Sequence, residues 1–291
     1  MIHTKQAPYQ TYAIAAPVPQ GAVPRGLYWD TLDPYHYVRL HTARGAFGPR
    51  DLLIVGGEDH KTGQEERPEE RWRRLESWAR TMFRELGEVE SRWSGEVLEP
   101  VDGIAFIGRN PLDSERVYVV TGDSGHGWTH GMIAGMLVRD LVLGRENDWA
   151  RLYDPARRTV RALGEFAREN ANVARQYASW LARGDVDDPA EIAPGEGALV
   201  RRGLEVLAVH RASDGALHAV SAVCTHLGCL VRWNRAESTW DCPCHGSRFD
   251  PQGRVVHGPA SKVLAPKEIG AERPGGAPAR GEDRVGRDAA L

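Results

Sequence analysis

The sequence contains no long uninterrupted apolar run. A membrane-spanning helix needs about 20 consecutive apolar residues, and the best candidate, at residues 132–143, is interrupted by Arg139 and Asp140. The residues after Met1 contain no apolar core of a signal peptide. We therefore expect a cytoplasmic protein with no membrane span.

The sequence also lacks a strong charge of either sign. The 37 Lys and Arg residues nearly balance the 40 Asp and Glu residues, which leaves a formal net charge of −3. General nucleic-acid binding needs a basic surface, so this function is not expected. The 291 residues are enough for two modest domains.

Cysteine is scarce, and all four cysteines lie in two short blocks, CTHLGC at 224–229 and CPCHGS at 242–247. Each block also offers a His, and Gly228 and Gly246 would let each block turn back sharply. Cys and His at short spacing indicate a metal site. A zinc site and a group of structural cysteines are the alternatives to an iron–sulfur centre, although two spare cysteines fit zinc poorly.

The two blocks together resemble the full motif of the Rieske domain family. The resemblance implies a 2Fe–2S cluster in which two Cys bind one iron and two His bind the other. The implied ligands are Cys224, His226, Cys242 and His245, and the implied disulfide joins Cys229 to Cys244. Because cytoplasmic thiols are mostly kept reduced, burial beside the cluster would have to protect that disulfide.

The same resemblance implies a set of residues around the cluster, namely Leu227, Ser247, Phe249 and Pro259. Ser247 matches a hydroxyl that hydrogen-bonds a bridging sulfide, and the segment 258–260 matches a proline loop that shields the cluster. Phe249 stands where high-potential relatives carry a Tyr that donates to a ligand sulfur. Donors to sulfur stabilise the reduced cluster, so we expect a potential below the top of the Rieske range of about −150 to +300 mV.

The first half of the chain shows strand and helix patterns. We expect irregular chain with short extended pieces over 1–34, strands at 36–40 and 51–55, a polar turn at 58–61 and helices over 68–86 and 130–143. A glycine-rich turn at 121–129 precedes the second helix. Free backbone N–H groups at such a turn suit a phosphate or a reduced flavin ring, although the spacing alone is also that of an ordinary turn.

Two segments, DGIAFIG at 102–108 and VYVVTGDSGHG at 117–127, resemble the C-terminal end of the FAD-dependent amino-acid-oxidase family. The pattern departs from that family at Ala105 and Asp123. The resemblance implies FAD and a small amine or amino-acid substrate. The residues implied to line the flavin are Gly122, Ser124, Gly125, His126, Gly127 and Trp128.

The sequence lacks the G-x-G-x-x-G fingerprint that cradles the FAD pyrophosphate in that family. The glycines at 56–57 and at 122–127 have the wrong spacing for it. We therefore expect a chain without the N-terminal nucleotide-binding half of such an enzyme.

The expected fold class is α+β. Residues 1–150 would form a partial flavin-oxidoreductase substrate domain, and 151–190 a linker with a helix over 154–182. Residues 191–271 would form a small antiparallel β Rieske domain, followed by a disordered tail at 272–291.

Two functions fit these expectations. One is a Rieske-type oxidoreductase that passes electrons between a flavin and a partner protein, with His226 and His245 at an exposed tip. The other is a stand-alone 2Fe–2S electron carrier in which residues 1–185 are a scaffold. Bound flavin would favour the first, and a cluster spectrum without flavin the second. A ring-hydroxylating oxygenase would need a mononuclear iron site of two His and a carboxylate, and no expected helix presents one.

Overall fold

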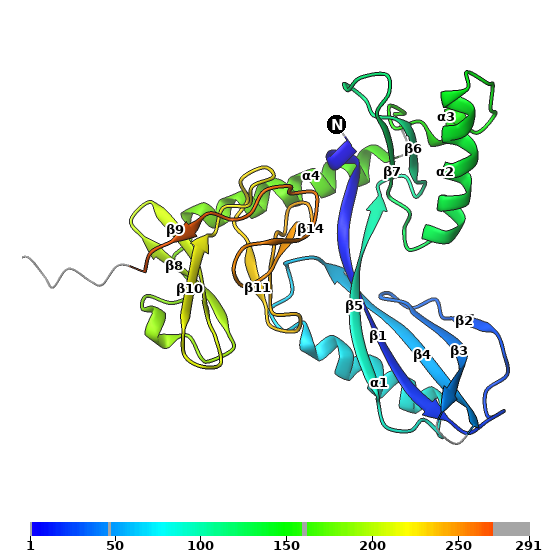
Figure 1. Cartoon of the computed structure of the whole chain (residues 1–291), viewed down its shortest axis with the longest axis horizontal. Coiled ribbons are helices and arrows are strands. Elements are labelled where there is room, and N and C mark those ends of the chain that lie inside the picture. The colour runs from blue at the N-terminus through cyan, green and yellow to red at the C-terminus, as the bar shows by residue number, and fades with distance from the viewer. Residues whose placement is uncertain (1, 46–47, 159–161, 270–291) are drawn as a thin grey trace, which may run out of the picture.

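The computed structural model describes residues 2–45, 48–158 and 162–269, so the tail expected at 272–291 lies outside the described residues. Helices and sheets both occur, in agreement with the expected fold class. The first half of the chain is built on one large sheet, and the C-terminal module, residues 182–269, is built on two small ones (Figure 1). Within the described ranges, no helix combines the length and apolarity needed to cross a bilayer.

A five-stranded antiparallel sheet organises the first half. The strands are β1 (Gln6–Val18), β2 (Leu27–Trp29), β3 (His36–Gly45), β4 (Gly48–Lys61) and β5 (Ser91–Pro100), in the order β2-β3-β4-β1-β5. Alternate residues of β1, including Tyr12 and Ile14, are fully buried. They pack against Leu75 and Ala79 of helix α1 (Glu69–Met82), which covers this face of the sheet.

Two expectations for this half are wrong. Residues 6–18 are neither irregular nor a short extended piece, because they form the long strand β1, which pairs with β4 on one side and β5 on the other. Its prolines, Pro8 and Pro17, lie near its two ends, where a missing N–H donor disturbs the sheet least. The expected polar turn at 58–61 is the end of β4, since His60 and Lys61 pair with β1.

A smaller unit follows β5. It comprises β6 (Phe106–Arg109), β7 (Tyr118–Thr121), α2 (Gly127–Val142) and α3 (Ala150–Tyr153). Ile107 of β6 and Leu137 of α2 are fully buried at its centre. Helix α2 begins at Gly127 rather than at 130, directly at the end of the glycine-rich turn.

Helix α4 (Leu163–Tyr177) and the 3-10 turn η3 (Ala178–Leu181) join the two halves (Figure 1). This element is shorter than the helix expected over 154–182. Residues 154–158 are non-helical because they are fixed to the first half. There Arg157 pairs with Asp102 at 2.7 Å, and Lys5 donates to two backbone carbonyls of the segment.

The C-terminal module consists of two four-stranded antiparallel sheets, in agreement with the small antiparallel β domain expected from the sequence. The first sheet contains β8 (Gly197–Arg202), β9 (Glu205–Arg211), β10 (Leu217–Ser221) and β15 (Pro266–Lys267). The second contains β11 (Arg232–Asn234), β12 (Thr239–Asp241), β13 (Arg248–Phe249) and β14 (Val255–His257). Side chains of both sheets, such as Val206, Val220, Trp240 and Phe249, share one core. Two further 3-10 turns are η1 (Ile2–Lys5) and η4 (Pro189–Glu191).

Candidate iron–sulfur centre and flavin-facing turn

Two loops of the C-terminal module bring the Cys and His blocks together. The first cluster loop, residues 224–229, lies between β10 and β11, and the second, residues 242–247, lies between β12 and β13. In each loop a glycine N–H, from Gly228 or Gly246, donates to the carbonyl of the first cysteine at 3.0 Å. Both glycines have a left-handed backbone, with φ of 81° and 80°. The two loops therefore repeat one turn, and only glycine adopts it without strain.

The loops present two free thiols and one disulfide. Cys224 and Cys242 are free and buried, whereas Cys229 and Cys244 form the disulfide that the resemblance implies. A hydrogen bond between the two thiols lowers the pKa of Cys224, and the same contact together with burial raises the pKa of Cys242. Two neighbouring sulfurs that share a proton readily supply thiolate, the form that binds iron.

Two imidazoles lie beside each other on the same loops. The rings of His226 and His245 are 4.9 Å apart and nearly perpendicular. Burial lowers the pKa of both, that of His245 to about 4, so both are neutral near pH 7. Their Nδ1 atoms are buried and have no hydrogen-bond partner in the described part of the chain. Two thiolates and two neutral imidazoles with unpaired nitrogens fit a Rieske-type cluster; the ligand assignment itself stays a prediction.

The expected exposed tip is wrong. His245 is only 8% exposed, and His226 is half-buried. The ring of His3, in η1, lies 4.6 Å from the ring of His226 and 6.0 Å from that of His245. The sequence gives no signal for this contact, because it depends on how the first half packs against the C-terminal module.

The other residues implied around the cluster lie in different surroundings. Ser247 is fully buried, and its Oγ accepts the N–H of Ala260 at 3.0 Å, which ties the proline loop to the second cluster loop. Pro259 and His245 line one small cavity. Phe249 is buried in the core, whereas Leu227 is 54% exposed.

Two residues that the sequence did not single out hold the first cluster loop. The Tyr177 hydroxyl donates to the carbonyl of Leu227 at 2.5 Å, and the Trp180 indole donates to the carbonyl of Gly228 at 3.1 Å. Both come from the connection formed by α4 and η3. The apolar stripe of this connection also packs on the core of the C-terminal module through Val173.

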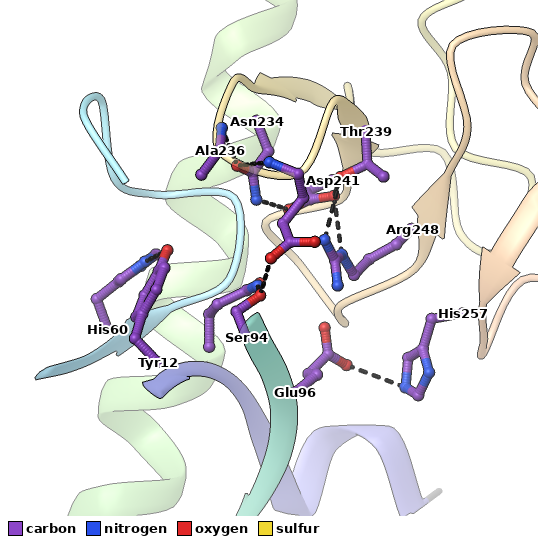
Figure 2. A network of polar contacts seen from close by, with 12 residues as sticks. Tyr12, His60, Ser94, Glu96, Asn234, Ala236, Thr239, Asp241, Arg248 and His257 are labelled. Carbon is purple, nitrogen blue, oxygen red and sulfur yellow. Dashed lines mark hydrogen bonds and ion pairs between the residues drawn. The ribbon is translucent and has the colours of Figure 1, made fainter. Parts of the chain in front are cut away.

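Polar side chains fix the first half against the C-terminal module (Figure 2). Ser94 of β5 donates to Glu237 at 2.5 Å, and Gln64 donates to the carbonyl of Pro243 in the second cluster loop at 3.1 Å. Glu96 of β5 points toward His257, with 3.4 Å between a carboxylate oxygen and Nε2. A Cβ added at Gly246 would overlap a carboxylate oxygen of Glu96, so the second cluster loop lies directly against β5.

The glycine-rich turn lies across β5 as well. Gly122 and Gly125 have φ of 71° and 77°, and Ser124 donates its N–H to the carbonyl of Leu98 at 3.3 Å. Four of the residues implied to line a flavin, Ser124, Gly125, His126 and Trp128, line one cavity of about 650 Å³. Gly122 lies beside Gln6 and Phe106 instead, and Gly127 begins α2. The flavin lining that the resemblance implies for this turn stays a prediction, and the sequence contains no G-x-G-x-x-G pyrophosphate cradle.

The comparisons with protein families indicate an iron–sulfur domain that follows a domain of the flavin-dependent oxidoreductase class. The family model described as Rieske (2Fe-2S) domain matches residues 182–267, and the model described as FAD dependent oxidoreductase matches residues 1–141. The chain therefore carries a Rieske domain behind a domain of the FAD dependent oxidoreductase family. The first family implies a 2Fe–2S cluster and the second implies FAD.

A relative with the same order of domains is the Rieske 2Fe-2S iron-sulfur protein YhfW of Bacillus subtilis (strain 168), which is 35% identical over 84% of this chain. This chain covers 48% of the length of that relative. The cytochrome b6-f complex iron-sulfur subunit 1 of Nostoc sp. is 60% identical over 16% of this chain and 27% of its own length. The glycine oxidase of Geobacillus kaustophilus is 17% identical, with a TM-score of 0.38 over 53% of this chain and 40% of its own.

Proposed function

We propose that the protein transfers electrons between a flavin at the glycine-rich turn and a 2Fe–2S cluster held by Cys224, His226, Cys242 and His245. A flavin exchanges two electrons with an organic substrate, whereas the cluster exchanges one electron at a time. Two successive one-electron reductions of the cluster would therefore reoxidise one reduced flavin.

The observation that carries this proposal is the position of β5 between the two sites. Successive residues of a strand point to opposite faces of the sheet. A Cβ at Gly125 of the turn would lie 3.9 Å from Val97, and a Cβ at Gly246 of the second cluster loop would overlap the carboxylate of Glu96. Neighbouring residues of one strand thus contact the turn and the cluster loop, so a single strand separates the two sites.

A small cavity supports the same short route. Its volume is about 270 Å³, and it is lined by Thr121, where the turn begins, and by His245 of the second cluster loop. Leu98 of β5 lines it as well. Electrons would leave the flavin through this region and enter the cluster on its His side.

We further propose that an outside electron-transfer protein meets the first cluster loop. His3 covers His226 from one side, whereas the neighbouring Leu227 is 54% exposed and Val263 of the adjoining segment is equally exposed. A partner that contacts these two side chains would approach the cluster without displacing η1.

The test measures how fast added reduced FAD reduces the cluster in the purified chain. Reduced FAD is added under anaerobic conditions, and cluster reduction is followed by EPR. We expect a rate that saturates with FAD concentration. In a Gly125→Val variant the added side chain occupies the turn, so FAD-driven reduction should be slower, while dithionite should still reduce the cluster fully.

Equal rates in the two proteins, or a rate that never saturates, would contradict the proposal. The alternative is a stand-alone electron carrier, which the missing dinucleotide fingerprint favours. That alternative predicts a cluster spectrum with no saturable response to reduced FAD.

A further inference from the structure

The first cluster loop meets solvent beside the connection formed by α4 and η3. Leu227 of the loop, Leu181 at the end of η3 and Val263 are each more than half exposed. Tyr177 joins the loop to the connection, because its hydroxyl donates to the Leu227 carbonyl. The residue before Val263 is tied to the loop as well, since its carbonyl accepts the hydroxyl of Thr225 at 2.6 Å. The side chains of Tyr177, Leu181, Leu227 and Val263 are called the cluster-loop surface below.

The segments that form this surface carry positive charge and no negative charge. Residues 170–184, 224–232 and 254–267 contain no Asp or Glu. Four of their basic side chains are exposed and have no carboxylate partner in the part of the chain that the structure describes, namely Arg175, Arg183, Arg232 and Lys262. Two others, Arg254 and Lys267, pair with acids outside these segments. Because the whole chain has a formal net charge of −3, this positive charge is a local feature.

Tyr177 connects the cluster-loop surface to the proposed sulfur ligands. Burial, and then the charges of Cys242 and Cys224, raises the pKa of its phenol. The phenol therefore lies within electrostatic reach of both sulfurs, although the side chain is partly open to solvent. Trp180 fixes the same connection to the loop a second time, because its indole donates to the Gly228 carbonyl. A single side chain, held in place, thus reaches from the neighbourhood of the sulfurs to the surface.

The imidazole side of the site is covered by the first half of the chain. The ring of His3 lies 4.6 Å from that of His226, and His245 is buried. The second cluster loop lies against β5, where a Cβ at Gly246 would overlap the carboxylate of Glu96. A partner protein therefore reaches the site at the first cluster loop without displacing η1 or separating the two halves.

We propose that an acidic electron-carrier protein docks on the cluster-loop surface, with Leu181 and Leu227 at the centre of the contact, the four unpaired basic side chains around it and Tyr177 as the electron exit. Apolar side chains within a small contact, together with complementary charge around them, suit a transient interface. One electron leaves the reduced cluster and reduces the oxidised carrier, and no bond forms or breaks. The inference rests on the proposed function in one respect, since it assumes the 2Fe–2S cluster.

The test uses one carrier in two charge states. Cytochrome c is basic, and succinylation of its lysines makes it acidic while the haem stays the same. The full chain, with its cluster reduced by dithionite and the excess removed, is mixed anaerobically with each oxidised form, and stopped-flow absorbance follows haem reduction. We expect the succinylated form to react at least about ten-fold faster at low salt, and its rate to fall as salt is added. The net charge of −3 would favour the basic form, so the local surface must produce this order.

Charge reversal then locates the contact. Lys262→Glu and Arg183→Glu should each slow the reduction of succinylated cytochrome c about three-fold or more. The matched control is Arg151→Glu, which makes the same change at an exposed position of α3, away from the C-terminal module (Figure 1). It should react like the parent chain. Leu181→Gln removes apolar contact without a change in charge and should slow the reaction about two-fold.

Binding can also be measured without electron transfer. When both proteins are oxidised, calorimetric titration reports docking alone. We expect saturable binding of succinylated cytochrome c at low salt and no saturable binding of the native form. Lys262→Glu and Arg183→Glu should weaken this binding about as much as they slow the reaction, and the EPR spectrum of each variant shows whether the cluster is kept.

A faster reaction with native cytochrome c would overturn the inference, as would equal rates for Lys262→Glu and Arg151→Glu in chains that keep the cluster. Either result can occur while reduced FAD still reduces the cluster at a saturable rate. A chain that reduced FAD cannot reduce would contradict the proposed function instead, and docking of the acidic carrier would still be measurable because dithionite supplies the electron. The two failures are therefore distinguishable.

Discussion

At the scale of single residues, Phe249 offers the sharpest test of the cluster environment. Its side chain is fully buried on β13, next to the second cluster loop. In Phe249→Tyr, a hydroxyl would donate to a ligand sulfur and stabilise the reduced cluster. We expect the reduction potential to rise by about 20–60 mV. This rise corresponds to a stabilisation of the reduced cluster by about 0.5–1.5 kcal/mol, the net contribution of one hydrogen bond.

The measurement is a redox titration followed by EPR. Phe249→Leu removes the ring without adding a donor, so it controls for altered packing and should give no rise. A potential that is the same in Phe249→Tyr and in the parent chain would mean that this position does not control the cluster.

Asp241 should control the stability of the second sheet of the C-terminal module. It is 1% exposed, pairs with Arg248 at 3.1 Å, and accepts hydrogen bonds from Asn234 and Thr239 (Figure 2). Asp241→Ala would leave the Arg248 guanidinium buried without its counter-ion, which typically costs about 3–5 kcal/mol. We expect urea unfolding, followed by circular dichroism, to show a loss of this size.

The exposed Asp187 provides the control for that experiment, since Asp187→Ala removes a carboxylate that is in contact with solvent. It should change the free energy of unfolding by less than about 0.5 kcal/mol. If both variants lose a similar free energy of unfolding, the buried ion pair of Asp241 and Arg248 contributes no more to stability than an exposed carboxylate does.

The meeting of the two cluster loops and the disulfide between them could be predicted, because the sequence motif of both loops is local. Two blocks of six residues contain the thiols, the imidazoles and the glycines of both turns. His3 could not be predicted, because its contact with the site joins residues distant in the sequence. A lone His near a chain start carries no signal of its own until the fold brings its ring beside His226.

At the scale of elements, the connection formed by α4 and η3 is a support of the cluster as well as a linker. Tyr177→Phe removes the donor to the Leu227 carbonyl and keeps the ring. We expect a loss of about 0.5–1.5 kcal/mol in the free energy of unfolding and faster loss of cluster absorbance on warming. The Leu227 carbonyl would then rely on solvent, which leaves the first cluster loop less ordered.

Leu181 lies at the end of the same connection and is 92% exposed, so Leu181→Ala is the matched control. It should release the cluster at the parent rate. If Tyr177→Phe also behaves like the parent chain, α4 and η3 act only as a tether between the two halves.

Element prediction succeeded where one periodic pattern decided it, as in α1, whose Leu75 and Ala79 face the sheet. It failed where composition and tertiary pairing disagreed. Prolines in β1 indicated irregular chain. In the structure, β1 pairs with β4 and β5, and its alternate residues Tyr12, Ile14 and Ala16 are buried. The charged end of β4 indicated a turn, yet pairing with β1 keeps it extended.

At the scale of the whole molecule, β5 separates the two proposed redox sites. It also forms the contact between the large sheet and the C-terminal module, which is called the β5 joint below. One of its faces meets the glycine-rich turn through Val97, and the other meets the second cluster loop through Glu96. Because both contacts come from consecutive residues, any movement of the C-terminal module relative to the large sheet would change the separation of the two proposed redox sites. The stability of this joint therefore bears directly on electron transfer.

Glu96 makes that joint sensitive to pH. Its side chain is 2% exposed, and burial, followed by the negative charge of Asp241, raises its pKa from 4.5 to about 9. The neighbouring His257 has a lowered pKa, because of burial and the charge of Arg248, so it offers no strong counter-ion near pH 7. The native protein thus keeps Glu96 protonated at a pH where the unfolded chain has already released that proton.

The direction of the pH effect follows from this difference. The contribution of Glu96 to stability is fully present below the unfolded pKa of 4.5 and is lost as the pH rises toward the folded pKa of about 9. The expected slope is about 1.4 kcal/mol per pH unit between these limits. Glu96→Gln keeps the shape of the protonated side chain and cannot ionise, so its advantage over the parent chain should grow steadily from pH 6 to pH 8.5.

Urea unfolding at these two pH values gives the free energy of unfolding of Glu96→Gln and of the parent chain. The difference between the two proteins removes the contribution of all other titrating groups. Glu88→Gln is the control, because the Glu88 side chain is 98% exposed, and it should follow the parent chain at both pH values. Parallel curves for Glu96→Gln and the parent would mean that water reaches Glu96 in the native state. The joint at β5 would then be open between the two halves, and the short route from flavin to cluster would lose its structural basis.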